Sequence, residues 1–378
     1  MHVTSRAPFT IRRRIALAVL LVSLIVPGAS APRASAASAT APKPPGNHAK
    51  GAALIDVASG RLIYSKRGDE PMLIASLTKI MTAIVAIEHA DLEAEVNVSP
   101  RAAGKEGSSI YLKSGERMKL RNMIFGLMLR SGNDAATAIA EHVGGSVGGF
   151  AFLMNKKADE IGMPNSHFMN PSGLDEPGHY ASANDMARLA AYALRNKDFR
   201  EIVGTRVKTA PNPHDPWDYK WVNKNKMLTM YEGADGVKTG YTKKALRTLV
   251  SSATRNGQQL VVVTLNDGDD WSDHRKLLDY GFENYPLQQV AAEGDPVPTA
   301  GVTAKLGSGF RYPFAPGERE RLTAAYEPQD ASQPAYALGY RGWIKYYMDG
   351  VPIGKTPVVA DSRATGGASS QEGKRGAG

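Results

Sequence analysis

The sequence of 378 residues contains no cysteine, which excludes disulfides, thiol nucleophiles and cysteine-ligated metal sites. Its eight histidines show no H-E-x-x-H spacing or comparable cluster, so we expect them to be surface or packing residues. The sequence also has no run of lysine and arginine interleaved with aromatic residues, the pattern typical of nucleic-acid binding. We therefore expect no metal, no other cofactor and no nucleic-acid partner.

A long apolar run near the N-terminus is missing as well. The run at residues 15–26 has twelve residues, whereas a bilayer span needs about 20. It follows three arginines at positions 12–14 and precedes Ala-Ser-Ala at positions 34–36, the layout of an export signal. We predict a signal peptide over residues 1–36, with an uncleaved anchor as the alternative. Cleavage would lower the formal charge from +9 to +4, because five arginines and no acids would be removed.

An exported chain would work outside the cytoplasm, in the cell wall or on the outer face of the cytoplasmic membrane. Residues 37–48 are rich in Ala, Ser, Pro and Lys and should form a flexible linker. No amphipathic helix that could lie on a membrane is evident at the C-terminus. A peripheral or N-terminal association with the membrane stays open.

The first part of the main domain, residues 49–286, predicts two strands followed by helices. Gly51–Val57 and Arg61–Ser65 surround a Ser-Gly turn and should form a hairpin. A helix should run from Ala75 to about Ala90, with apolar residues on most of its faces, as in a buried helix. Up to about residue 199 the pattern is mostly helical, so we predict an all-helical lobe there. Its expected helices are Leu120–Leu129, Ala135–Val143, Phe150–Ile161 and Asn184–Leu194.

Strand patterns return after a loop over residues 210–221. Three strands are expected at Gly236–Thr242, Leu246–Ala253 and Gln259–Leu265, and Asn-Gly between the last two is a strong hairpin signal. A helix should follow from Ser272 to about Glu283. Two early and three late strands imply an α/β fold: one antiparallel sheet flanked by helices, with the helical lobe inserted. The active site would lie where the sheet edge meets this lobe.

The C-terminal part changes in composition. Residues 287–360 are rich in Gly, Pro and short β-type runs, such as Tyr336–Tyr340 and Trp343–Tyr347, with a turn at Asp349-Gly350. We predict a small β-rich domain. It could hold the main domain off the membrane, dock a partner, or only pack and stabilise. Residues 361–378 lack apolar periodicity and predict a disordered tail.

Ser76 and Lys79 lie three residues apart at the start of the expected central helix. This spacing puts a hydroxyl and an amine on the same side, one turn apart. A serine hydroxyl is a weak nucleophile until a base takes its proton, and lysine is a base only when neutral. Burial and positive neighbours, of which Lys238 is a candidate, lower a lysine pKa. The pair can therefore be a nucleophile and its base.

Two further motifs are separated widely along the chain. Ser131-Gly132-Asn133 breaks two apolar helices, and Lys238-Thr239-Gly240 lies on a predicted strand. Each has an alternative explanation. An acid follows Ser131 by three residues, as in a capping box, and the same pattern at Ser182 is explained by capping alone. Lys238-Thr239-Gly240 could be a solvated strand edge. The spacing of Ser76 and Lys79 alone is also weak evidence, because a single S-x-x-K arises by chance in a chain of this length.

The order and context of the three motifs resemble the active-site serine penicillin-recognising fold of penicillin-binding proteins and serine β-lactamases. More narrowly, residues 51–285 resemble the D-alanyl-D-alanine carboxypeptidases of the low-molecular-mass penicillin-binding proteins. This resemblance implies a peptidoglycan stem peptide as substrate and β-lactam antibiotics as acylating inhibitors. The segments that carry it are residues 75–83 (ASLTKIMTA), 131–135 (SGNDA), 168–174 (FMNPSGL) and 235–242 (DGVKTGYT).

The resemblance also implies site residues. Ser76 would attack the carbonyl between two terminal D-alanines, with Lys79 as base. Ser131 would hydrogen-bond both and relay a proton to the leaving amine. Asn133 would bind the substrate amide, and Lys238 and Thr239 would bind its terminal carboxylate. Gly240 would keep the strand edge open for a substrate that lies antiparallel to it. The backbone N–H groups of Ser76 and Tyr241 would form the oxyanion hole.

Two positions depart from the family pattern. Tyr241 stands where many relatives have histidine after K-T-G, so a role of that side chain in deacylation is not carried over. An arginine that assists carboxylate binding is unassigned, with Arg247, Arg255 and Arg275 as candidates.

Other functions stay open at this point. A peptidoglycan D,D-endopeptidase would use the same chemistry with a different pocket. A serine β-lactamase shares the motifs, but class A members usually have Asp where Gly132 stands, and Asp175 and Glu176 are not in the context of their deacylating loop. A non-catalytic wall-binding or scaffold protein is the alternative from another class.

Overall fold

The computed structural model describes residues 42–299 and 302–361. The predicted signal peptide, the start of the linker and the predicted tail after Asp361 lie outside the described residues. Within them, no helix has both the length and the apolar character that crossing a membrane requires.

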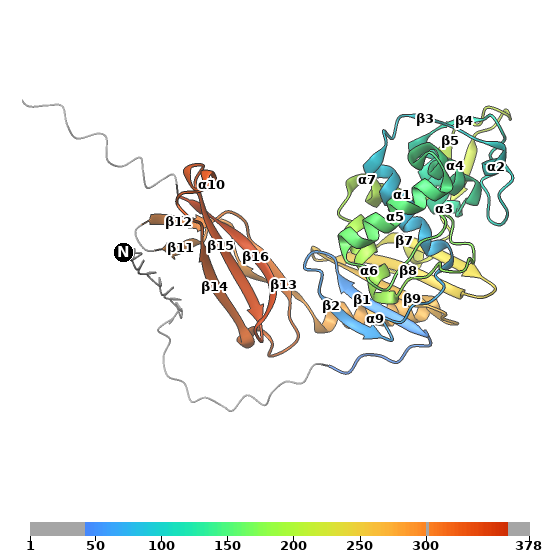
Figure 1. The fold of residues 1–378 in the computed structure, drawn as a ribbon. Helices are drawn as coiled ribbons and strands as arrows, with labels where there is room; N and C mark the ends of the chain where they lie inside the picture. Colours follow the sequence, from blue (N-terminus) through green and yellow to red (C-terminus); the bar gives the residue numbers. More distant parts are fainter. Residues whose placement is uncertain (1–41, 300–301, 362–378) are drawn as a thin grey trace, which may run out of the picture.

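The central sheet has five antiparallel strands in the order β2-β1-β9-β8-β7 (Figure 1). Gly51 lies opposite Leu265, so the first and last strands of this part of the chain are direct neighbours. The predicted sheet, assembled from both ends of the main domain, is confirmed. Its strands are β1 (Gly51–Asp56), β2 (Leu62–Lys66), β7 (Ala234–Thr242), β8 (Leu246–Arg255) and β9 (Gln258–Leu265).

The two faces of this sheet bury alternate residues of the same strands, as the two-residue period of a strand requires. Ile55 and Val261 face a large core shared with the helical lobe, whereas Leu54 and Val262 face a second core. Helix α9 (Asp270–Asn284) contributes Leu277 and Leu278 to that second core. Both faces of the sheet are therefore covered by other elements. Functional groups of the sheet are left to its edges, one of which is β7.

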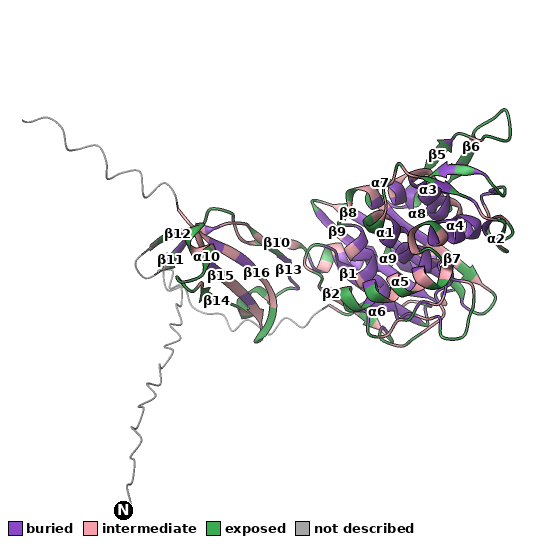
Figure 2. Cartoon of the chain, turned by 45° about the horizontal axis from the view of Figure 1, so that its top comes forward, coloured by how far each residue is buried: buried purple, intermediate pink, exposed green. Residues whose placement is uncertain are grey.

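Helix α1 (Thr78–His89) is the central helix of the lobe, and nine of its residues are buried (Figure 2). It contacts α3, α4, α5, α6 and α7, which explains why its sequence is apolar on most faces. The other helices of the lobe and its surroundings are α2 (Pro100–Ala103), α3 (Leu120–Arg130), α4 (Asn133–Gly144), α5 (Val147–Ile161), α6 (Ala183–Ala193), α7 (Lys197–Gly204) and α8 (Met227–Met230).

The lobe is mostly helical, as expected, but it also contains one short hairpin, in which strand β3 (Glu95–Asn97) pairs with β4 (Arg117–Lys119). A second hairpin follows the lobe, where β5 (Val207–Ala210) pairs with β6 (Tyr219–Val222). In β3 and β4 only the central residue is buried, and the second hairpin includes the ends of the stretch expected to be a loop. Strands of three or four residues are too short for their alternation to be recognised in a sequence.

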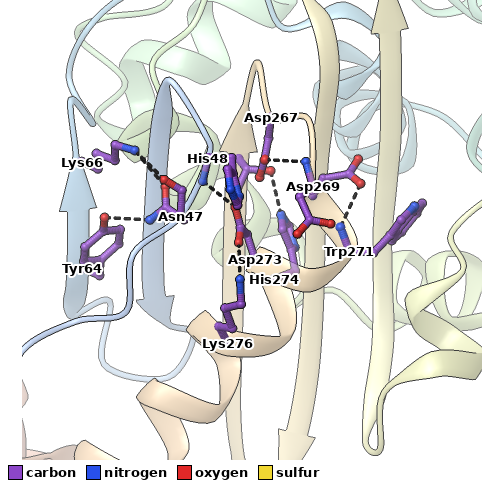
Figure 3. A network of polar contacts seen from close by, with 12 residues as sticks. Asn47, His48, Tyr64, Lys66, Asp267, Asp269, Trp271, Asp273, His274 and Lys276 are labelled. Carbon is purple, nitrogen blue, oxygen red and sulfur yellow. Dashed lines mark hydrogen bonds and ion pairs between the residues drawn. The ribbon is translucent and has the colours of Figure 1, made fainter.

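Helix α9 is fastened to the N-terminal segment by the polar network of Figure 3. The backbone N–H of His48 donates to Asp273 at 2.6 Å, and Lys276 reaches the other oxygen of the same carboxylate at 3.0 Å. Asn47 donates to the hydroxyl of Tyr64 on β2 at 2.9 Å. Residues 47 and 48 are thereby ordered against the sheet, although the sequence predicted a flexible linker up to residue 48.

The C-terminal β segment, residues 287–361, forms a five-stranded and a two-stranded sheet around its own small core. Tyr336–Ala337 was expected in a strand, but these residues belong to a short helix, α10 (Pro334–Ala337), because Pro334 favours the first position of a helix. The strands are β10 (Leu287–Ala291), β11 (Pro296–Thr299), β12 (Val302–Leu306), β13 (Phe310–Pro313), β14 (Leu322–Pro328), β15 (Tyr340–Met348) and β16 (Val351–Ala360).

Candidate active site

Ser76 lies in a single 3₁₀ turn, Ala75–Leu77, that leads directly into α1. This turn is held from two sides. Thr78 Oγ1 donates to the carbonyl of Ala75 at 2.9 Å. Gly173 approaches the same carbonyl so closely that a Cβ there would lie 1.9 Å from the oxygen. The glycine, with its φ of +82°, therefore lets a second loop support the turn that carries Ser76.

Lys79 is fully buried, and its Nζ lies 3.0 Å from Ser76 Oγ. The same nitrogen lies 2.7 Å from Asn133 Oδ1 and 2.5 Å from the carbonyl oxygen of Ser172. A neutral amine has two N–H groups and one lone pair. The two carbonyl-type oxygens can only accept, so they take both N–H groups. The lone pair is left for the hydroxyl proton of Ser76, which is the arrangement that a general base needs.

Three lysines converge at this site. Burial, followed by the charges of Lys238 and Lys224, holds the pKa of Lys79 well below its usual range, whereas Asp134 acts in the opposite direction. Burial and the charge of Lys224 lower the pKa of Lys238 to about 7. The site therefore favours a neutral Lys79 and attracts anions. Sequence reasoning missed Lys224, because one lysine in a loop cannot be told from a solvated surface residue.

Asn133 and Ser131 lie at the junction of α3 and α4. Asn133 Nδ2 donates to the carbonyl of Glu106 at 2.7 Å, so both ends of this amide are engaged. Ser131 is buried and left-handed, with a φ of 66°. Among the described residues, its hydroxyl has no hydrogen bond to Ser76 or Lys79. The expected bonds are therefore not formed in this structure, where Asn133 and Ser172 accept the N–H groups of Lys79 instead.

Strand β7 passes close to Ser76. A Cβ on Gly240 would lie 3.0 Å from the backbone nitrogen of Ser76 and 2.4 Å from Thr248 Oγ1. Gly240 is thus required because the backbone of Ser76 approaches β7 at this point. The sequence predicted only that this glycine keeps the strand edge open for the substrate. This approach brings Lys238, Thr239 and Tyr241 to the same site as Ser76.

The three candidate arginines are separated by the fold. Arg247 on β8 lies opposite Tyr241 and forms an ion pair with Asp270. Arg255 lies at the other end of β8, paired with Asp279, and Arg275 is on α9, which packs against the sheet. Among the three candidates for binding the substrate carboxylate, Arg247 is therefore the one that lies beside Tyr241.

The loop over residues 168–180 forms the wall beside Ser76. Asn170 Oδ1 accepts the backbone N–H of Gly173 at 2.8 Å and holds the loop in its turn. His179 receives the backbone N–H of Met169 on Nδ1, so its Nε2 donates to Thr78 Oγ1 at 2.8 Å. Burial lowers the pKa of His179 to about 4 and keeps it neutral. This segment carries part of the family resemblance, but its role could not be recognised in the sequence, because its contribution at Lys79 is the backbone carbonyl of Ser172.

One set of residues in the described part of the chain brings potential metal ligands within 4.8 Å of one another: His48, Asp269 and Asp273. Asp269 and Asp273 lie at the start of α9, and His48 lies in the N-terminal segment beside it, where Asp273 is already engaged by His48 and Lys276 (Figure 3). Hydrogen bonds and an ion pair account for Asp273, and none of the three residues belongs to the Ser76 site.

The family model of the D-alanyl-D-alanine carboxypeptidases matches residues 38–269, more than half of the chain. DacC of Escherichia coli, a D-alanyl-D-alanine carboxypeptidase, is 32% identical over 358 residues and covers 87% of each chain. This chain belongs to that family. DacF of Bacillus subtilis is 37% identical over 247 residues, and the chain spans 63% of that carboxypeptidase's length. The family assignment and the serine-peptidase chemistry expected from the sequence are confirmed.

The fold of this chain is also found among solved structures. Penicillin-binding protein 5 of Haemophilus influenzae superposes with a TM-score of 0.69 at 26% identity, covering 84% of this chain and 98% of that one. The predicted α/β fold with its helical lobe is therefore confirmed, and the similarity extends into the C-terminal β segment.

Proposed function

We propose that this carboxypeptidase removes the terminal D-alanine of peptidoglycan stem pentapeptides through an acyl-enzyme on Ser76. The observation that carries the proposal is the contact of Lys79 with Ser76, with both N–H groups of the neutral amine bound elsewhere. β-Lactam antibiotics would acylate the same hydroxyl. Such a substrate lies in the cell wall, so the protein would act outside the cytoplasm.

In the proposed reaction, Lys79 takes the proton of Ser76 as the hydroxyl attacks the carbonyl between the two D-alanines. The backbone N–H groups of Ser76 and Tyr241 stabilise the oxyanion. Ser131 relays this proton from Lys79 to the leaving amine as the peptide bond breaks, which makes Lys79 neutral again. Water then attacks the acyl-enzyme, Lys79 takes its proton, and the proton passes to Ser76 Oγ as the ester bond breaks. Lys238 and Thr239 bind the terminal carboxylate, whose negative charge suits a site with three lysines.

The first test is release of free D-alanine from a peptide ending in Lys-D-Ala-D-Ala, with and without penicillin. The wild-type protein should release D-alanine, and penicillin should block the release through a covalent adduct. Ser76→Ala should abolish both the release and the adduct, because it removes the hydroxyl that Lys79 contacts. A Ser76→Ala protein that still released D-alanine would contradict the proposal.

A D,D-endopeptidase that cuts cross-links remains the second candidate, because it uses the same catalytic groups. Mass spectrometry of cell-wall fragments after incubation distinguishes the two. Loss of terminal D-alanine from uncross-linked pentapeptides supports the carboxypeptidase, whereas conversion of cross-linked dimers to monomers supports the endopeptidase.

A further inference from the structure

A pocket of about 410 Å³ lies beside the Ser76 site, on the side of the loop over residues 168–180. Two contacts place it there. Thr242 Oγ1, at the end of β7, donates to Asp175 at 2.9 Å, and His179 in the pocket wall contacts Thr78. Leu73 and Met72, which precede the turn of Ser76, form part of its apolar wall.

Charges of both signs lie on the rim of this pocket. Asp175 and Glu176 come from the loop, and Lys244 comes from the turn between β7 and β8. All three side chains are exposed, and among the described residues none of them forms an ion pair. Each acid accepts one hydrogen bond from a neutral partner, Thr242 or Asn170, which leaves its charge uncompensated. A ligand with both an amine and a carboxylate would complement this rim.

The direction of the substrate leads to the same place. A substrate antiparallel to β7, with its terminal carboxylate at Lys238 and Thr239, runs towards Thr242 as it is followed back to its N-terminus. An extended chain advances about 3.3 Å per residue. The leaving D-alanine then lies near Gly240, with its carboxylate at Thr239, and the acylating D-alanine lies near Tyr241. The third residue of the stem peptide reaches Thr242 and the mouth of the pocket.

In stem peptides this third residue is a diamino acid. A lysine side chain ends in an amine alone, whereas a diaminopimelate side chain ends in an amine and a carboxylate. We propose that the pocket binds the amino-carboxylate end of a diaminopimelate residue, with Asp175 and Glu176 facing its amine and Lys244 facing its carboxylate. This assignment rests on the proposed carboxypeptidase function and names the substrate class of that site.

The test compares two pentapeptides that end in D-Ala-D-Ala and differ only in the third residue, meso-diaminopimelate or lysine. The readout is kcat/KM for D-alanine release by the mature protein. We expect the diaminopimelate peptide to be preferred about fivefold, as for one additional solvent-accessible ion pair. Lys244→Met keeps the aliphatic stem but removes the charge, and it should reduce this preference to near one. Lys243→Met, next in sequence but outside the pocket, should keep the preference.

Equal kcat/KM for both peptides, or an unchanged preference in Lys244→Met, would overturn the pocket assignment while leaving the carboxypeptidase function standing. Absence of D-alanine release from both peptides, together with absence of a penicillin adduct, would instead overturn the proposed function and the pocket with it. A loss of preference in Lys243→Met equal to that in Lys244→Met would show a general charge effect and would also reject the pocket.

Discussion

No carboxylate of the described residues hydrogen-bonds to Lys79, which suits the proposed role of this amine as a base. The groups in contact with it are a hydroxyl, an amide oxygen and a backbone carbonyl, none of which carries a negative charge. Asp134 is buried nearby, but its oxygens accept from Ser109 and from the backbone of Ile110 and Leu112. The acid therefore clamps a loop, while the positive charges of Lys238 and Lys224 dominate at Lys79.

Replacing Lys224 with Met should shift the pH profile of kcat/KM. Lys224 lowers the pKa of Lys79, so its removal raises that pKa, and a higher pH is then needed to obtain the neutral amine. The acidic limb of the profile should move to higher pH, since kcat/KM reports the free enzyme. Lys226→Met, on an exposed neighbour, is the control that should leave the limb in place. An unshifted limb in Lys224→Met would remove Lys224 from the electrostatics of the site.

At the scale of single residues, the sequence predicted Ser76 and Lys79 but not the complete site. The pair could be recognised because a three-residue spacing on a helix fixes two side chains relative to each other. The carbonyl of Ser172 could not be recognised, because every residue carries one. The conformation of Ser131 depends on how α3 ends, which its own sequence does not determine.

Two glycines bring three separate elements into contact at the nucleophile. Gly173 admits the loop over residues 168–180 to the carbonyl of Ala75, and Gly240 admits β7 to the nitrogen of Ser76. The five central strands could be predicted from sequence because runs of five to ten residues rich in apolar and β-branched side chains are bounded by turn signals such as Asn256-Gly257. The close approaches could not, because a glycine that admits a neighbouring backbone looks in the sequence like one in a turn.

Gly240→Ala should lower kcat by about 10²–10³, the usual cost of losing one oxyanion-hole donor. The new Cβ would meet the backbone of Ser76 and Thr248 Oγ1, so β7 must move away and take the N–H of Tyr241 with it. Gly268→Ala is a matched control, because a Cβ there has open space around it. Circular dichroism should show both variants folded, and wild-type kcat in Gly240→Ala would contradict the proposed oxyanion hole.

Across the whole molecule, the main sheet and the C-terminal β segment are joined by Arg61. The two terminal nitrogens of its guanidinium group, Nη1 and Nη2, donate to the carboxylate of Glu318 at 2.6 and 2.7 Å. Nη1 also donates to the carbonyl of Pro313. Both side chains are mostly buried, at 16% and 13% exposed. The sequence could not predict this contact, because its partners lie more than 250 residues apart and neither belongs to a recurring motif.

Arg61→Met should therefore weaken the attachment of the C-terminal β segment. It leaves the mostly buried carboxylate of Glu318 with only the more distant Arg321, 3.6 Å away, as an ionic partner, and we expect a loss of about 1–3 kcal/mol in the free energy of unfolding. Calorimetry should show the wild-type unfolding transition shifted to lower temperature or split into two. Arg67→Met breaks an ion pair with Glu70 whose partners are 52% and 38% exposed, so it should change stability much less than Arg61→Met does. Equal effects of the two substitutions would mean that Arg61 behaves as an ordinary surface residue and does not couple the two parts.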